Sequence, residues 1–297
     1  MLSITLRIFI AFEILFYATI ARYYFDASAL GAGLLTLYCM LAARAMIVAS
    51  TYVIARRTPS PAWPLTVLQT LRMVLAEYAA FIACFLLIIP FEKWWMGADR
   101  LKPGNDRPPL LLIHGYGCSR GAWWWLRRRL EATGWTVATI SLEPIYASID
   151  HYIDPLARRI DAVLKQTGAP QLILVGHSMG GLLGRAYCKR HGVQRVACLI
   201  TLGTPHAGSE LARLGMGENA RQMIPGSPWL QALAHQTALP ETIVIYSRHD
   251  NYVLPASNQE LPGAINQPIN ALGHLAMLFS PRIGNALLEA LEKRQVR

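Results

Sequence analysis

Three long apolar stretches occupy the first third of the chain. They run over residues 8–25, 29–55 and 73–91, and each contains at most two charged side chains. A helix needs about 20 mostly apolar residues to cross a bilayer, a length that the second and third stretches reach. We therefore expect residues 1–92 to form a membrane anchor of about three helices. Two alternatives stay open: a cleaved signal peptide in place of the first helix, or the buried helical bundle of a soluble protein.

A charged side chain lies well inside each apolar stretch: Glu13 in the first, Arg44 in the second and Glu77 in the third. A lone charge surrounded by lipid is unfavourable and needs an opposite charge or a polar partner. We therefore expect Arg44 to face Glu13 or Glu77 across a helix interface. Such a pairing would be structural rather than catalytic.

After a polar linker at residues 93–108, short apolar runs alternate with longer amphipathic segments. Buried strands that alternate with helices are typical of a parallel sheet with crossover helices. The fold class expected for residues 109–297 is therefore α/β, a mostly parallel sheet flanked by helices. The expected strands are residues 110–113, 136–140, 172–175, 196–202, 242–246 and 265–269, and the expected helices are residues 123–133, 152–167, 180–191 and 282–293.

Composition and charge narrow the class of protein. Apolar residues make up 53% of the 297 residues and charged residues 15%, which excludes a disordered chain and argues against a wholly soluble one. The net charge of +10 suits anionic lipid headgroups, whereas no nucleic-acid-binding motif accompanies it. The five cysteines form no CxxC pair or cluster, so neither a disulfide scaffold nor a metal site is expected.

The strongest chemical signal is a Gly-x-Ser-x-Gly motif at residues 176–180, placed between an apolar strand and a helix. A sharp turn there lifts the hydroxyl of Ser178 to the carboxyl end of the sheet, beside the N–H groups of a helix N-terminus. The alternative, a phosphate-binding loop, would need a G-x-G-x-x-G pattern or a Walker lysine, and neither is present. Ser178 is therefore the expected nucleophile.

A serine nucleophile needs a histidine base and an acid that orients it, in the chain order Ser, acid, His. Asp250 is the one aspartate after Ser178, and it follows an expected strand. Among the downstream histidines, only His274 lies between the last strand signal and the last helix. The glutamates at positions 210, 218, 241, 260, 289 and 292 are alternative acids in less suitable places. The expected catalytic residues are thus Ser178, Asp250 and His274.

An oxyanion intermediate needs two fixed N–H donors. The N–H of Met179, directly after the nucleophile, is one candidate. The other is the N–H of Tyr116, in the loop His-Gly-Tyr-Gly after the first expected strand. His114 in that loop is expected to have a structural role.

From about residue 108 onward, the chain resembles an α/β-hydrolase of the bacterial lipase and esterase kind. The resemblance rests on the His-Gly-Tyr-Gly loop at 114–117, the serine motif, the segment Thr-Pro-His-Ala-Gly at 204–208, Asp250 and His274. The resemblance covers about two thirds of the chain. The motifs are similar to those of triacylglycerol lipases and inositol-deacylase-like enzymes. The resemblance implies hydrolysis of carboxylic esters through an acyl-enzyme, with no metal and no cofactor.

The region expected to be a cap, at about residues 205–240, is rich in apolar side chains. They could close the cap onto the domain or line an acyl pocket; for the second role we single out Met223, Trp229 and Leu230. The basic run Arg127–Arg129 is most simply a solvated helix face, with anionic headgroups as the alternative.

Together these features predict a membrane-anchored serine hydrolase that cleaves lipid or other acyl esters. An acyltransferase or thioesterase with the same triad is the alternative, and a non-catalytic membrane scaffold is a further one. The expected partners are an acyl-ester substrate and the bilayer, without nucleic acid; the oligomeric state stays open. A bacterial inner membrane crossed several times fits the pattern, and the basic flanks of a three-span anchor favour a catalytic domain on the outer side.

Overall fold

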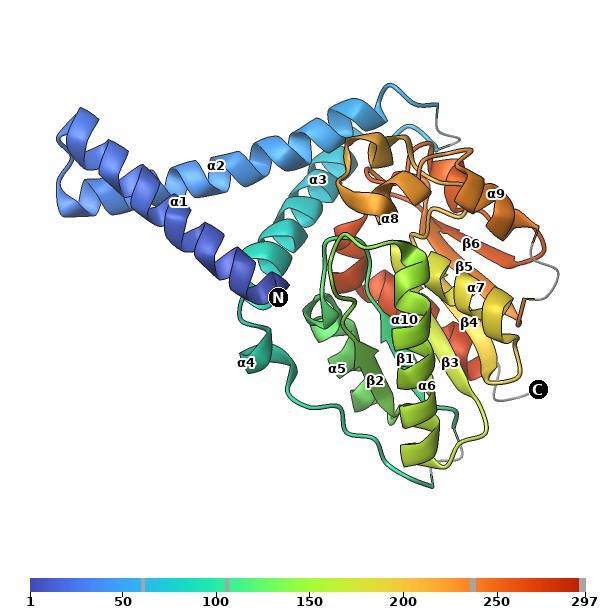
Figure 1. Ribbon diagram of the computed structural model, residues 1–297. Helices are drawn as coiled ribbons and strands as arrows, with labels where there is room; N and C mark the ends of the chain where they lie inside the picture. The colour runs from blue at the N-terminus through green and yellow to red at the C-terminus, as the bar shows by residue number, and fades with distance from the viewer. Residues whose placement is uncertain (60–61, 105–106, 236–238, 294–297) are drawn as a thin grey trace.

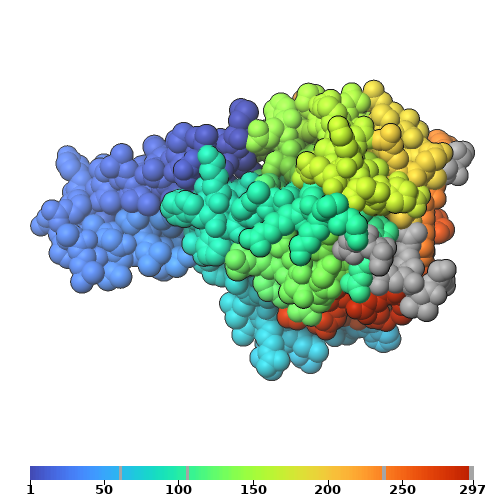
Figure 2. All heavy atoms as spheres, turned by 90° about the horizontal axis from the view of Figure 1, so that it is seen from below, coloured from blue at the N-terminus to red at the C-terminus, as the bar shows by residue number. Residues whose placement is uncertain are grey.

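Three apolar helices open the computed structural model, which describes residues 1–59, 62–104, 107–235 and 239–293. They are α1 (Leu2–Phe25), α2 (Ala29–Ala55) and α3 (Val67–Ile82), and α3 continues without a break into a π-helix, η1 (Ala83–Ile88). All three are long and apolar enough to cross a membrane. Helices α1 and α2 form a hairpin that projects from the rest of the molecule (Figures 1 and 2). Two residues between α2 and α3, Ser60 and Pro61, lie outside the described residues.

The charge pairing expected between the apolar helices is confirmed for the first two. The guanidinium of Arg44 forms a two-pronged ion pair with the carboxylate of Glu13, and both side chains are buried between α1 and α2. Each charge is thereby neutralised where a lone one would be unfavourable. Glu77 takes no part in this pair and is fully buried against the loop that carries His274.

The second part of the chain is built on one parallel six-stranded sheet, as the sequence predicts. Its spatial order is β2-β1-β3-β4-β5-β6, and every neighbouring pair is parallel. Four inner strands are fully or almost fully buried because helices cover both faces of the sheet, which explains their nearly continuous apolar sequences. The strands are β1 (Leu110–Ile113), β2 (Val137–Ile140), β3 (Leu172–His177), β4 (Val196–Leu202), β5 (Thr242–Ser247) and β6 (Ile265–Ile269).

Helices pack on the two faces of this sheet and form two apolar cores. One core joins α5 (Trp124–Ala132) and α10 (Pro281–Lys293) to the sheet and to the N-terminal helices, which contribute Leu2, Ala80 and Cys84. The other core joins α6 (Ile153–Thr167) and α7 (Met179–His191) to the opposite face. The N-terminal helices therefore share a core with the sheet and the helices that cover it.

The segment before β1 is packed rather than extended. It contains α4 (Glu92–Met96) and Asp99, whose carboxylate meets the guanidinium groups of Arg120, Arg127 and Arg159 at 3.1, 3.0 and 2.6 Å. The expectation that residues 127–129 form a solvated face is wrong for Arg127, because this side chain is only 5% exposed and also donates to the carbonyls of Met96 and Ala98.

Short helices complete the connections at the carboxyl ends of the strands (Figure 1). Between β4 and β5 the cap consists of η4 (Glu210–Leu214), α8 (Gly217–Gln222) and α9 (Pro228–Ala234). The remaining 3-10 turns are η2 (Arg120–Trp123), η3 (Ile149–Tyr152), η5 (Ala256–Gln259) and η6 (Leu275–Phe279). Helix α3 packs against η6, directly after His274.

Candidate active site

Ser178 stands at the sharp turn between β3 and α7. Its backbone adopts φ 55° and ψ −126°, a left-handed conformation that a serine rarely takes. The turn is possible because its flanks are glycine: a Cβ on Gly176 would lie 2.4 Å from the nitrogen of Gly181, and one on Gly180 would lie 2.2 Å from the carbonyl oxygen of Ile113. A strained serine at a strand-to-helix turn is the geometry of a nucleophile elbow.

Asp250 and His274 come together from the loops after β5 and β6. The Nδ1 atom of His274 lies 2.7 Å from Oδ2 of Asp250, and both side chains are buried. The other carboxylate oxygen accepts the N–H groups of Tyr252 and Val253 at 2.7 and 2.9 Å, which fixes the carboxylate plane. Burial alone would lower the pKa of His274, but the charge and hydrogen bond of Asp250 outweigh burial and hold it above the ordinary value.

His177 and Tyr252 fix the position of His274. The sequence motifs did not single out either residue for this role. The Nε2 atom of His177 lies 3.2 Å from the carbonyl oxygen of His274, and the two rings are 4.7 Å apart. The ring of Tyr252 stacks against that of His274 at 5.2 Å. Burial holds the pKa of His177 well below its ordinary value, so this residue is a neutral donor. The sequence signal for these two roles was position: His177 directly precedes Ser178, and Tyr252 lies two residues after Asp250.

The two residues expected to supply the oxyanion donors flank Ser178. Met179 begins α7, where backbone N–H groups lack helical partners, and Tyr116 lies in the loop after β1. His114 fastens that loop: its Nε2 accepts the N–H of Leu142 at 2.9 Å, so its Nδ1–H faces the carbonyl of Gly115 at 2.8 Å. Burial lowers the pKa of His114 to about 4, which keeps the ring neutral.

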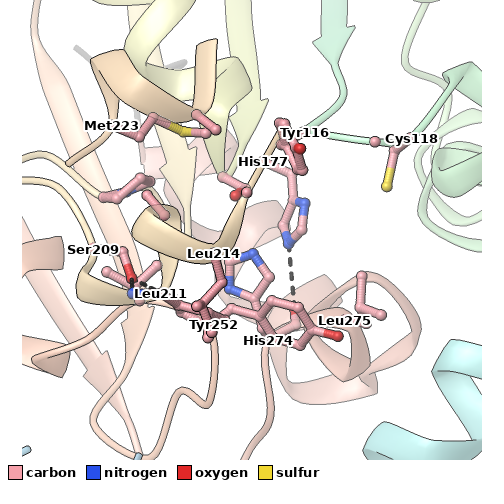
Figure 3. A pocket seen from close by; sticks show the side chains of 18 of the residues that line it. Tyr116, Cys118, His177, Ser209, Leu211, Leu214, Met223, Tyr252, His274 and Leu275 are labelled. Atoms are coloured by element: carbon pink, nitrogen blue, oxygen red, sulfur yellow. Dashed lines mark hydrogen bonds between the residues drawn. The ribbon is translucent and has the colours of Figure 1, made fainter. Parts of the chain in front are cut away.

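A pocket of about 380 Å³ contains both Ser178 and His274. The side chains of His177, His274 and Tyr252 meet there, with Leu211, Leu214 and Met223 of the cap along its border (Figure 3). Its lining also includes Phe81 and Phe85, from α3 and η1.

The three residues expected to contact substrate differ in their relation to the pocket. Met223 lines the pocket. Trp229 lies outside the pocket lining and donates its indole N–H to Asp150 at 2.9 Å, while Leu230 is buried in the core under the cap. These two side chains close the cap onto the domain, which was the other role considered for apolar cap residues. Phe81 and Phe85 belong to the pocket, although the sequence placed them only in a membrane helix.

Tyr116 has a second task that no sequence motif indicated. Its hydroxyl donates to the carbonyl of Met216 and accepts the N–H of the same residue, each at 2.8 Å. The loop after β1 therefore holds the tip of the cap above the pocket.

Among the described residues, no group of three or more His, Cys, Asp or Glu side chains is arranged to hold a metal ion.

The comparisons with known proteins agree with this fold. Residues 108–229 match the protein family described as alpha/beta hydrolase fold. A triacylglycerol lipase of Pseudarthrobacter phenanthrenivorans is 34% identical over 114 residues, which cover 36% of this chain and 35% of that enzyme. A triacylglycerol lipase of Pseudomonas fragi is 30% identical over 151 residues, covering 46% of this chain and 51% of the relative.

Solved structures extend the likeness over the whole sheet. The mature form of the Bacillus licheniformis lipase BlEst2 superposes with a TM-score of 0.57 and 20% identity, covering 66% of this chain and 96% of that protein. The part of the chain from β1 to α10 therefore has the α/β-hydrolase fold. The chain spans about a third of the length of the first curated relative that it matches, and the N-terminal helices lie outside the residues that match the family.

Proposed function

We propose that the protein is a serine ester hydrolase that works through an acyl-enzyme. The observation that carries the proposal is one pocket lined by both Ser178, at its strained turn, and His274, whose Nδ1 is paired with the buried carboxylate of Asp250. The names of the similar lipases support the same reaction.

The proposed reaction begins when His274 takes the proton of Ser178 and the serine oxygen attacks the ester carbonyl. The N–H groups of Met179 and Tyr116 stabilise the oxyanion. His274 then protonates the leaving alcohol, and water repeats the sequence to release the acid. Asp250 holds the Nδ1–H tautomer of His274, which leaves Nε2 free to act as the base.

Labelling with a fluorophosphonate probe tests this assignment. The purified full-length chain in detergent should incorporate one probe, on the peptide that contains Ser178. Ser209 offers a matched control in the same pocket, because its hydroxyl is already bonded to the carbonyl of Tyr252 at 2.6 Å. Ser209→Ala should keep the label and Ser178→Ala should lose it; an unlabelled wild type, or a label elsewhere, would contradict the proposal.

The substrate class that fits the pocket is an ester with a long acyl chain. Apolar side chains form most of the lining, and one wall belongs to a helix whose outer face carries exposed Leu71, Leu75 and Leu87. At the cap, Leu214 and Met216 are 73% and 63% exposed beside the pocket. Apolar surface around an apolar pocket favours lipid esters, phospholipids included, over small polar ones. The alternative reaction is acyl transfer to an alcohol acceptor. Analysis of the products distinguishes this transfer from hydrolysis.

Replacing Phe85 by alanine should change chain-length preference. Losing the burial of an aromatic ring against an acyl chain should lower kcat/KM for a twelve- to sixteen-carbon ester roughly tenfold. An acetyl ester does not reach the ring, so its kcat/KM should stay within about twofold. Phe12→Ala is the control, because Phe12 is 61% exposed on α1 and lies outside the pocket. Equal losses for both esters would contradict an acyl-chain role for Phe85.

We further propose that the hairpin of α1 and α2 is the part that enters the bilayer, with two crossings. Ser3, at the start of α1, donates to the carbonyl of Pro90 at 2.7 Å, and Leu2 belongs to a core shared with α5 and α10. Near the end of α2, Thr51 accepts a hydrogen bond from Asn251 at 2.7 Å. Both ends of the hairpin therefore lie against the catalytic domain, and its turn is remote from it (Figure 1).

Two crossings place the N-terminus and the catalytic domain on one side of the membrane. Three crossings, as expected from the apolar stretches alone, would place them on opposite sides. Reporter fusions at the two termini, in the full-length chain, distinguish these topologies. We expect both reporters to be active on the same side, and opposite sides would contradict the two-crossing hairpin.

A further inference from the structure

Glu77 is a fully buried carboxylate that the proposed reaction does not use. It lies on α3, and its two oxygens accept the backbone N–H groups of Leu275 and Ala276 at 3.0 and 2.8 Å. These are the two residues that follow His274 and begin η6. The first N–H groups of such a turn lack partners within the turn, so the carboxylate of a different segment satisfies them.

The approach of α3 to the histidine loop is unusually close. A Cβ on Gly273 would lie 2.4 Å from Oε2 of Glu77 and 2.6 Å from the hydroxyl of Tyr52. Glycine is therefore required immediately before His274 for the N-terminal helices to reach the loop. No sequence motif of the hydrolase domain indicated this requirement, because the contacting residues lie about 200 positions earlier in the chain.

The loop of Asp250 is tied to the N-terminal helices as well. Asn251 donates to the hydroxyl of Thr51 on α2 at 2.7 Å, and its amide oxygen accepts the N–H of His274 at 3.0 Å. One side chain thus joins α2, the acid loop and the histidine loop. Helices α2 and α3 hold the loops of both members of the Asp–His pair.

We propose that Glu77 is a positioning residue for His274, so that α3 is a working part of the active site. The inference rests on the proposed hydrolase function. The carboxylate fixes the backbone on the C-terminal side of His274, while Asn251 and His177 fix the N–H and carbonyl of His274 itself. Displacing the base from the serine by about 1 Å is enough to slow the chemical step on the order of 100-fold.

The test compares steady-state kinetics of full-length variants in detergent, with a soluble short-chain ester. Glu77→Leu removes both acceptors, and we expect kcat to fall roughly 10- to 100-fold with KM within about twofold. Glu77→Gln keeps one acceptor and turns an N–H₂ group toward the other N–H, so its kcat should lie between those of the wild type and Glu77→Leu. Because Gln is nearly isosteric with Glu, this variant keeps the test usable if Glu77→Leu does not fold.

Glu13→Gln is the matched control: it alters another buried carboxylate of the N-terminal helices, bonded to Arg44 rather than to a catalytic loop. Its kcat should equal that of the wild type. Wild-type kcat in a folded Glu77→Gln or Glu77→Leu chain would overturn the inference, as would a rise in KM at constant kcat. A wild type without ester hydrolysis would instead overturn the proposed function.

Discussion

Ser178→Ala should reduce kcat/KM for a soluble ester by roughly 10⁶-fold. The loss is this large because the hydroxyl forms the bond to the acyl group, and without it no acyl-enzyme can form. The change removes one oxygen and keeps the Cβ of the side chain, so the packing around the turn is nearly unchanged. The fold should therefore survive, and thermal unfolding should match the wild type.

The measurement is initial-rate hydrolysis of a chromogenic acetyl ester by the purified variant. Ser209→Ala provides the comparison within the same pocket and should stay within about tenfold of the wild type, because the Ser209 hydroxyl bonds only backbone groups, of Leu211 in the cap and of Tyr252 and Leu254 after β5. Residual activity in Ser178→Ala above one thousandth of the wild-type value would assign the nucleophile to another residue.

Asp250→Asn should lower kcat roughly 10⁴-fold, a loss of the size expected when the base is held in the wrong tautomer. The asparagine oxygen can keep the N–H groups of Tyr252 and Val253, so its N–H₂ group would face Nδ1 of His274. Nδ1 would then have to accept, which places the proton on Nε2 and blocks the base. KM should change little, because Asp250 does not line the pocket of Ser178.

The pH dependence of kcat/KM provides an independent test of how Asp250 acts on His274. In the wild type, kcat/KM should fall as the pH drops through the pKa of His274, because only the neutral ring accepts the serine proton. Asp250 raises this pKa against the opposing effect of burial. Asp250→Asn removes that charge, so the acid limb of the residual activity should move to lower pH. An acid limb that stays in place would mean that another group controls it.

The sheet and the Asp–His pair could be predicted because local patterns determine them. The strands β1 and β4 begin and end where the apolar runs do, since apolar continuity marks burial on both faces. Asp250 and His274 follow the last two strands, and parallel strands deliver such loops to one edge of the sheet. The motif around Ser178 likewise predicted a sharp turn between strand and helix.

Contacts between distant segments were beyond the sequence. Glu77 was recognised as a buried charge that needs a partner, but a helical pattern cannot distinguish an arginine from two backbone N–H groups of a loop nearly 200 residues away. Trp229 is the type of side chain expected to contact substrate, but its indole N–H donates to Asp150 and the residue lies outside the pocket lining. Arg127 belongs to a basic run, but its guanidinium is buried and forms an ion pair with Asp99.

The place of Glu77 on α3 sets the boundary at which the protein can be shortened. A cut chosen from hydropathy would fall near residue 92 and would remove the two acceptors of the η6 turn, together with Phe81 and Phe85 of the pocket wall. A cut in the loop between α2 and α3 would leave Glu77, Phe81 and Phe85 with the domain; it would discard the projecting hairpin together with Thr51, the α2 partner of Asn251. The functional unit therefore includes at least α3, so a shortened form of this protein must keep one apolar helix.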